Sequence, residues 1–207
     1  VNFSKKLNLD VWVVFMMPHL IANLNEWKKK IEIISSLGIK KIIIMDSAGV
    51  LNPITTSKLI SFLSKNYKKI SFGFHAHNNF NSAVWNTITA IESGAKIIDA
   101  TIRGFGAGAG NTQLEVLLTL LYELNINTGI DLKLVYELSE EFPKMFKKKI
   151  SLPQTTASNI LSAKFGLFSG FAPKVHNLSK MLKLNPLESF KAIGEKKLVA
   201  GQEDLIL

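Results

Sequence analysis

Short apolar segments rich in β-branched residues recur along the first half of the chain. Near-continuous apolar runs of this length are typical of strands buried on both faces of a sheet. The segments between them carry apolar residues every three or four positions, which predicts amphipathic helices. The four predicted strands begin at regular intervals and cover residues 11–17, 41–45, 70–74 and 96–102.

Signals for helix ends support the same repeat. The helix predicted at 25–37 is followed by Gly38, and glycine favours the left-handed conformation found just after many helices. Asn52 and Pro53 form a turn and helix-start signal before the next helix. The other predicted helices of this part cover residues 55–63, 81–92 and 111–124.

Four strand–helix units in a row predict a parallel sheet. Because crossovers between parallel strands are right-handed, two arrangements remain: an open doubly wound sheet, or a (β/α)8 TIM barrel of which these units would be half. The pattern changes after Asn125. A helix is predicted at 131–142, and the remainder, 153–207, predicts three short helices without a strand. We therefore expect a small helical unit after the α/β part.

Polar residues stand at or directly after the end of every predicted strand. In parallel α/β proteins the functional groups gather at the carboxyl ends of the strands. We therefore expect one shared site, built from the side chains at these four ends. They are His19, Asp46, Ser47, His75, His77 and Arg103.

His75 and His77 are the strongest candidates for chemistry in this set. Residues two apart on a strand share a face, so both imidazoles would point the same way. Two neutral imidazoles can chelate a divalent ion, with a carboxylate as the usual third ligand. The alternative is a pair of polar strand-end residues bonded to the backbone. The position beside other strand-end polar groups favours metal binding.

A glycine-rich segment, 104–111, follows the fourth predicted strand and precedes a helix. Its amides could bind a phosphate or carboxylate at the helix N-terminus, or its glycines could allow close packing, with Asn111 as the N-cap. A dinucleotide fingerprint is disfavoured, because the segment does not follow the first strand. Asp46 is expected to be a hydrogen-bonded strand-end residue, and His19 and His176 are expected to be structural or surface histidines.

The composition narrows the functional classes. The formal charge is +9, but every basic residue except Arg103 is a lysine, and sites for phosphate or bases favour arginine. We therefore interpret the lysines as solvated helix faces and expect no nucleic-acid partner. No apolar run is long enough to span a membrane and the start shows no secretory signal, so a cytoplasmic protein is expected. Cysteine is absent, which excludes disulfides and thiolate ligands.

Several of these residues fall in motifs that resemble one enzyme family. The segments that carry the likeness are Phe15-Met16-Met17, Met45-Asp46-Ser47-Ala48-Gly49, Gly73-Phe74-His75-Ala76-His77-Asn78-Asn79, Gly106-Ala107-Gly108-Ala109-Gly110-Asn111 and Gly201-Gln202-Glu203-Asp204. Together they resemble the 4-hydroxy-2-oxovalerate aldolases, part of a superfamily of metal-dependent pyruvate aldolases, 3-hydroxy-3-methylglutaryl lyases and isopropylmalate synthases. The likeness spans nearly the whole chain, and the last motif favours the aldolase branch.

The resemblance implies the TIM barrel, with the four strands as its fifth to eighth, and a C-terminal helical domain. The two domains would then cover residues 1–145 and 146–207. It also implies a divalent metal, Mn2+ or otherwise Mg2+, Co2+ or Zn2+, bound by His75, His77 and an aspartate of the first strand. That aspartate would precede Val1, and the chain, which lacks an initiator methionine, is expected to be part of a longer protein.

The activity implied by the resemblance is the cleavage or formation of a 4-hydroxy-2-oxo acid, with pyruvate and an aldehyde as the other reactants. The metal would chelate the 2-oxo acid, and Ser47 matches a position that contacts bound pyruvate. An acylating aldehyde dehydrogenase is the partner that the C-terminal domain of the family docks. Self-association is left open.

Two residues depart from the family pattern. Phe168 stands where the aldolases have a tyrosine for proton transfer, and Tyr136 is the last tyrosine of the chain. Arg103 replaces a small residue and could hold an additional carboxylate or phosphate. We therefore expect an aldolase with an altered 2-oxo acid substrate. The alternatives are a partner-dependent or inactive homologue with a binding or assembly role, and a synthase that condenses an acyl thioester with a 2-oxo acid.

Overall fold

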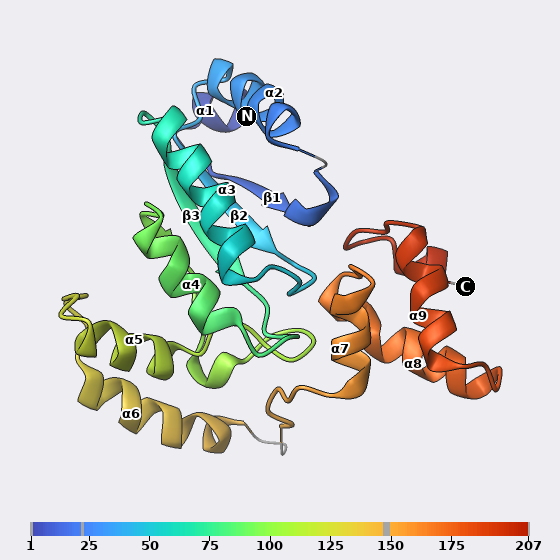
Figure 1. The fold of residues 1–207 in the computed structure, drawn as a ribbon. Helices are drawn as coiled ribbons and strands as arrows, with labels where there is room; N and C mark the ends of the chain where they lie inside the picture. The colour runs from blue at the N-terminus through green and yellow to red at the C-terminus, as the bar shows by residue number, and fades with distance from the viewer. Residues whose placement is uncertain (1, 22, 147–149, 207) are drawn as a thin grey trace.

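The computed structural model describes residues 2–21, 23–146 and 150–206. A parallel sheet stands at the centre of the α/β part, and each strand pairs with the one before it in sequence (Figure 1). The first three predicted strands are confirmed, with small shifts at their ends. The strands are β1 (Val13–Met16), β2 (Lys41–Asp46), β3 (Ser71–Ala76) and β4 (Ile97–Ile98).

Helices follow the strands as predicted. At the start of α3, the Thr55 N–H donates to the Asn52 side chain, the Asn52 N–H donates to Thr55 Oγ1, and Pro53 lies in the first turn. Gly38 follows α2 with a φ of 71°, which confirms the predicted helix end. The helices of this part are α1 (Asn2–Lys6), α2 (Leu24–Ser36), α3 (Pro53–Asn66), α4 (Ala83–Glu92), α5 (Leu114–Glu123) and α6 (Leu132–Glu141).

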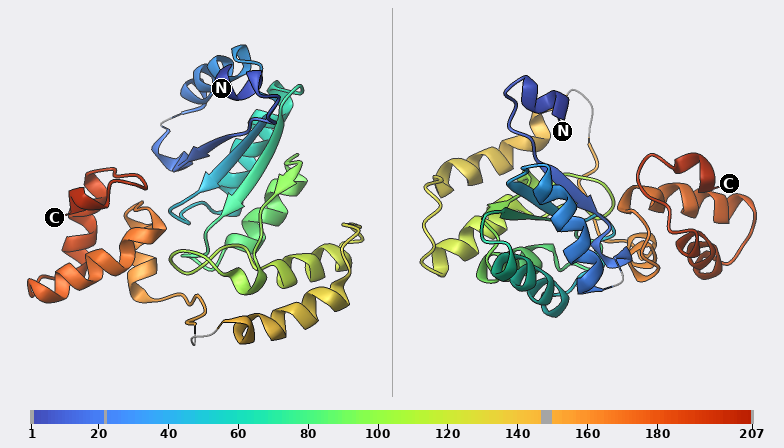
Figure 2. Two further views of the ribbon diagram at one scale, coloured as in Figure 1. Left: turned by 180° about the vertical axis from the view of Figure 1, so that it is seen from behind. Right: turned by 90° about the horizontal axis from the view of Figure 1, so that it is seen from above.

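The helices α2, α3 and α4 pack on one face of the sheet (Figure 2). The strand residues that alternate with those facing the helices point to the other face of the sheet. On that face, Val14 and Met16 of β1 remain 45% and 37% exposed. Helices on one face, with strands in sequence order, form half of a (β/α)8 barrel; a doubly wound sheet has helices on both faces. The strand residues buried against the helices include Ile42, Ile44, Phe72, Phe74 and Ala76.

The fourth unit differs from the prediction at its strand. β4 holds two residues instead of the predicted 96–102. The chain leaves the ladder with β3 early, because Thr101 pairs with Gln113 and the next residues turn into the 3-10 helix η2 (Ile102–Gly104). The apolar character of this segment therefore reflects burial near α5 rather than a long strand.

The start of α5 also differs from the prediction. The helix begins at Leu114 after Gln113, so Asn111 is not its N-cap. Instead, Asn111 forms a bridge with His77, and its side-chain amide donates to the Phe105 carbonyl oxygen. These contacts hold Asn111 in the glycine-rich loop, and the helix starts only after it.

The C-terminal part is helical, as predicted. It has a separate apolar cluster around Phe171, Val175 and Phe190. Figures 1 and 2 show this helical unit beyond the carboxyl ends of the strands. The helices of this unit are α7 (Ala157–Lys164), α8 (Ala172–Met181) and α9 (Pro186–Glu195), with the 3-10 turns η4 (Ser169–Phe171) and η5 (Glu203–Ile206). The α/β part has two further 3-10 turns, η1 (Pro18–Leu20) after β1 and η3 (Phe142–Met145) after α6. The division into domains at 145/146 stays a prediction.

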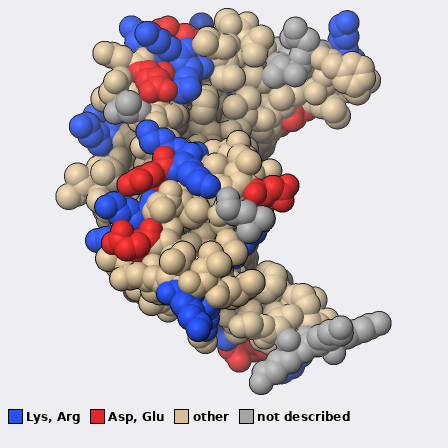
Figure 3. All heavy atoms as spheres, turned by 90° about the vertical axis from the view of Figure 1, so that its right-hand side faces the viewer, with Lys and Arg blue, Asp and Glu red and all other residues tan. Residues whose placement is uncertain are grey.

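Charged side chains are mixed over the surface. On the face drawn in Figure 3, basic and acidic residues are interspersed with uncharged ones. Lys28 and Lys29 of α2 are exposed, in keeping with a solvated helix face. Within the described ranges, every helix is too short or too polar to cross a membrane.

Two isoleucines of α3 test the one-sided core. Ile60 is fully buried against the sheet, whereas Ile54 is 80% exposed. We expect Ile60→Ala to lower the free energy of unfolding by about 2–5 kcal/mol, because it leaves a cavity in the core. Ile54→Ala, the matched control, should change it by about 0.5 kcal/mol or less. Urea denaturation measures both, and equal losses would contradict the packing described.

Candidate functional site

β3 delivers His75 and His77 to the carboxyl end of the sheet. Successive side chains of a strand point to opposite faces of the sheet. Because Phe74 and Ala76 point toward the helices, His75 and His77 point away from them. Their imidazole centroids are 5.2 Å apart. The structure therefore brings the pair together on one face, as the alternation predicts.

Each imidazole is held through its Nδ1 atom. His75 Nδ1 lies 3.3 Å from Asp99 Oδ2, and His77 Nδ1 lies 3.3 Å from the Ala107 carbonyl oxygen. Both partner atoms are acceptors, so each Nδ1 carries the proton and a neutral ring presents its lone pair at Nε2. Neither Nε2 has a hydrogen-bond partner within the described part of the chain. Metal-ligating histidines are held in the same way, by an acceptor on the other nitrogen.

His77 is the more buried member of the pair, with 6% of its surface exposed. Burial lowers the pKa of its imidazole to about 4, and the neighbouring His75 acts in the same direction. The neutral imidazole is the form that binds a metal.

β2 ends in Asp46 and Ser47, both fully buried. The Asp46 carboxylate accepts hydrogen bonds from the N–H groups of Val50 and Leu51, which confirms it as a hydrogen-bonded strand-end residue. Burial raises the pKa of this carboxyl to about 6, although these bonds oppose the shift. Ser47 Oγ lies 3.3 Å from the Met45 carbonyl oxygen, and its contact with a substrate stays a prediction.

The glycine-rich loop, 104–110, is closed by hydrogen bonds within the protein. The Ala109 N–H donates to Asn79 Oδ1 at 3.0 Å, and the Asn111 N–H donates to the Gly104 carbonyl oxygen at 2.8 Å. These two amides are already bonded and are not free to bind an anion. A Cβ at Gly108 or Gly110 would also come within 2.7 Å or 2.2 Å of another atom. Of the two interpretations left open by the sequence, the geometry favours close packing.

Arg103 is tied to the helices α5 and α6. Its backbone N–H donates to both carboxylate oxygens of Glu115, at 3.1 Å each. Its guanidinium lies 3.5 Å from the Glu140 carboxylate. The backbone has a φ of 55°, in the left-handed region, and the bond to Glu115 helps to hold it there. The guanidinium therefore already has a carboxylate beside it, and its role in substrate binding stays a prediction.

The C-terminal helical unit reaches the strand ends through residues 166–169. The Ser169 N–H and hydroxyl both donate to the Ser47 carbonyl oxygen, at 2.9 and 2.6 Å. His19 Nε2 lies 3.2 Å from the Gly166 carbonyl oxygen. Contacts with the ends of β1 and β2 thus anchor both ends of this short segment.

Phe168 lies between these two anchors. Its half-buried ring packs edge-on against Phe171, with centroids 5.3 Å apart. His19, the partner of Gly166, is itself largely buried. This burial lowers the pKa of its imidazole, and its buried Nδ1 has no hydrogen-bond partner. The buried contact with Gly166 is in keeping with a structural histidine, and the role of His19 stays a prediction.

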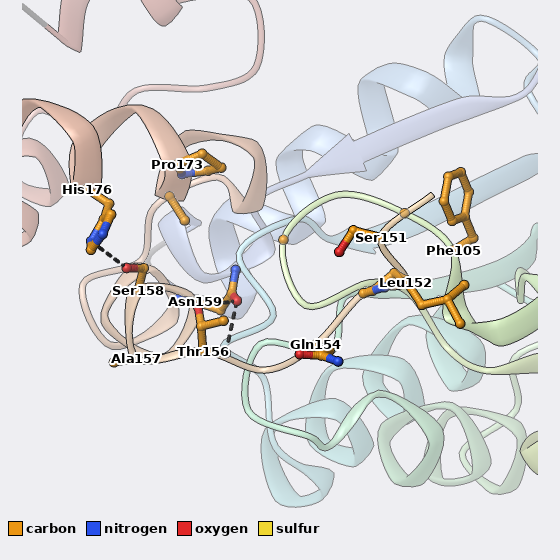
Figure 4. A pocket seen from close by; sticks show the side chains of 14 residues that line it. Phe105, Ser151, Leu152, Gln154, Thr156, Ala157, Ser158, Asn159, Pro173 and His176 are labelled. Carbon is orange, nitrogen blue, oxygen red and sulfur yellow. Dashed lines mark hydrogen bonds between the residues drawn. The ribbon is translucent and has the colours of Figure 1, made fainter. Parts of the chain in front are cut away.

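A cavity of about 700 Å³ opens between the glycine-rich loop and the C-terminal helices (Figure 4). Phe105 and Gly108 line it from the loop, and Ser158 and His176 line it from α7 and α8. His176 Nδ1 lies 3.0 Å from Ser158 Oγ. No strand-end pattern marks His176 in the sequence, because a helix of the C-terminal unit carries it to the cavity.

The ligand set of a metal is incomplete in the described part of the chain. No three His, Cys, Asp or Glu side chains within it converge in a metal-binding arrangement. The side-chain oxygen of Asn111, which pairs with His77, is buried without a hydrogen-bond partner. An orphaned buried oxygen of this kind calls for an explanation. The role of His75 and His77 as metal ligands stays a prediction.

The half barrel places the chain in the class of TIM-barrel proteins, whose sites lie at the carboxyl edge of the sheet. Comparison with known families agrees with this class. Residues 1–141 match the HMGL-like family, and the chain belongs to it. Residues 153–207 match the DmpG-like communication domain.

Relatives of this chain include proteins named 4-hydroxy-2-oxovalerate aldolase, which confirms the resemblance seen in the motifs. The one from Pectobacterium atrosepticum is 41% identical over 100% of this chain and 59% of its own length. The one from Spirochaeta aurantia is 40% identical over 100% of this chain and 60% of its own length. The chain therefore spans about three fifths of these relatives.

Solved structures show the same fold. The N-terminal domain of a putative aldolase from Bacteroides vulgatus is 25% identical, with a TM-score of 0.67 over 82% of this chain and 55% of that one. The carboxyl transferase domain of Rhizobium etli pyruvate carboxylase has a TM-score of 0.81 over 99% of this chain and 37% of that one. Its identity is 14%, so this second likeness concerns the fold alone.

Two glycines with left-handed backbones test the packing of the loop. A Cβ at Gly108 would lie 2.7 Å from Asn79 Oδ1 and 2.9 Å from Ser169 Cβ, whereas a Cβ at Gly129 would meet no atom within 4 Å. We expect Gly129→Ala to cost about 1–2 kcal/mol from its backbone alone. Gly108→Ala should cost about 1–3 kcal/mol more, from overpacking. Thermal and urea unfolding measure both losses, and equal losses would contradict the close contact.

Proposed function

We propose that the chain is part of a divalent-metal-dependent aldolase that cleaves or forms a 4-hydroxy-2-oxo acid, with pyruvate and an aldehyde as the other reactants. The names of the curated relatives support this activity. The single observation that carries it is the pair His75 and His77, whose Nδ1 atoms are held and whose Nε2 atoms are free on one face. The proposed ion is Mn2+, with Mg2+, Co2+ or Zn2+ as alternatives.

A bound ion would supply Lewis acidity to the carbonyl of the 2-oxo acid, which cleavage of the nearby carbon–carbon bond requires. The residues of this chain would hold and orient the reactants. Asp99 and the Ala107 carbonyl oxygen fix the two imidazoles, and burial keeps His77 neutral. We place Ser47 beside the bound pyruvate, with its backbone held by Ser169.

Phe168 and Arg103 support a substrate that differs from 4-hydroxy-2-oxovalerate. Phe168 offers no hydroxyl, so residue 168 cannot move the proton that the tyrosine of the family moves. Arg103 could bind an additional carboxylate or phosphate of the substrate in place of its contact with Glu140.

The second candidate function is a partner-dependent or inactive homologue with a binding or assembly role. Phe168, which lacks the hydroxyl of the family's tyrosine, favours it. The match of residues 153–207 to the DmpG-like communication domain supports an acylating aldehyde dehydrogenase as the partner. Sedimentation of the 207-residue chain tests the partner-dependent form of this candidate: a stable, monodisperse monomer would argue against dependence on a partner. The thioester-dependent synthase, self-association and a cytoplasmic location stay predictions.

The metal site is tested by His75→Ala in the full product of the gene. We expect its dissociation constant for Mn2+ to rise by about 100-fold or more, because a ligand is lost. His176→Ala is the matched control, since His176 lies on α8 with Ser158 as its partner. Calorimetry and metal analysis measure binding, and pyruvate release measures activity. Unchanged Mn2+ affinity in His75→Ala would refute the site.

The missing hydroxyl is tested by Phe168→Tyr. If residue 168 serves proton transfer, this change should raise kcat for pyruvate release by about 100-fold, within the usual range for general acid–base catalysis. Phe165→Tyr, a control in the same apolar cluster, should leave kcat unchanged. A kcat that does not respond to Phe168→Tyr would show that proton transfer uses a different group.

A further inference from the structure

Asn79 is a fully buried side chain that joins three separate segments. Its Nδ2 donates to the Ala48 carbonyl oxygen after β2 at 2.9 Å, and to Ser169 Oγ of the C-terminal unit at 2.8 Å. Its Oδ1 accepts from the Ala109 N–H of the glycine-rich loop at 3.0 Å. One amide thus bonds the end of a strand, a loop and the helical unit at once.

Two glycines pack closely against Asn79. A Cβ at Gly108 would come within 2.7 Å of Asn79 Oδ1, and a Cβ at Gly49 would come within 3.0 Å of the Asn79 backbone nitrogen. Both glycines have positive φ, which allows the close approach. Tight packing and three hydrogen bonds make this junction a rigid point of the molecule.

Two of the joined segments also place a residue of the candidate site. Ala48 follows Ser47, whose carbonyl oxygen accepts both bonds from Ser169. Ala109 lies two residues after Ala107, whose carbonyl oxygen holds His77 Nδ1. Asn79 is therefore the shared partner of the segments that place Ser47 and orient His77.

We propose that Asn79 is a positioning residue that couples the C-terminal helical unit to the His77–Ala107 contact and to Ser47. When its amide is removed, the loop and the segment 166–171 should loosen together, and His77 should lose its fixed orientation. The effect on metal binding rests on the proposed function. The coupling between loop and helical unit does not.

Asn86 provides a matched control. It is also a fully buried asparagine, and its Nδ2 donates to the Leu51 carbonyl oxygen at 2.8 Å. It lies in α4, outside the junction. Asn79→Ala and Asn86→Ala both leave buried polar groups without partners, so both should lower stability. Only the first should loosen the junction.

The experiment is hydrogen–deuterium exchange of the full gene product, together with its dissociation constant for Mn2+. For Asn79→Ala we expect exchange in both 104–111 and 166–171 to speed up about tenfold, as the loss of buried hydrogen bonds implies. We also expect about 10- to 100-fold weaker Mn2+ binding, the usual effect of disturbing the outer partner of a ligand. Asn86→Ala should change neither. If Asn79→Ala loses stability like Asn86→Ala but leaves both readouts unchanged, the proposal is overturned.

A second pair of variants decides the matter if Asn79→Ala does not fold. Ser169→Ala removes the hydroxyl that joins Asn79 to Ser47 but keeps the backbone donor. Its control is Ser179→Ala, since Ser179 is also buried and its hydroxyl bonds the Leu184 carbonyl oxygen within the C-terminal unit. Faster exchange of 104–111 in Ser169→Ala alone supports the coupling. Exchange that changes only near residue 169 overturns it. If the wild type binds no Mn2+, the proposed function fails, and the exchange data still test the coupling.

Discussion

Burial of alternate strand residues against a single layer of helices is the constraint on which the candidate site depends. Phe72 and Phe74 of β3 are driven into this layer, so His75 points to the opposite face. A shift of β3 by one residue would bury the histidine and expose the phenylalanines, which the apolar core does not allow. Parallel pairing then brings the ends of all strands to one edge.

At that edge, hydrogen bonds to two acceptors orient the rings of the histidine pair. Asp99 and the Ala107 carbonyl oxygen hold the two Nδ1 atoms, and they belong to segments that follow β4 in the sequence. The Ala107 loop is itself held by Asn79, which also holds the C-terminal unit. The orientation of His77 thus depends on contacts far from its own strand, which explains why a helical appendage bears on a site in the barrel.

Local patterns predicted most of the fold, because strand and helix periodicity reflects burial of neighbouring residues. They failed at β4 and at the start of α5, where the pairs Thr101–Gln113 and His77–Asn111 override local preference. The His75–His77 geometry followed from alternation alone. The role of Asn79 could not be predicted, since its partners lie 30, 31 and 90 residues away in sequence. The place of His176 at the cavity could not be predicted for a similar reason, because packing of α8 brings it there.

The protonation pattern of the histidine pair tests the central claim most directly. A long-range 1H–15N correlation spectrum of the metal-free protein, recorded at mildly alkaline pH, reports which ring nitrogen carries the proton. The hydrogen bonds to Asp99 and Ala107 require the Nδ1–H form of both rings, with Nε2 unprotonated and ready to bind a metal. Spectra with the proton on Nε2 of His75 or His77 would contradict the account.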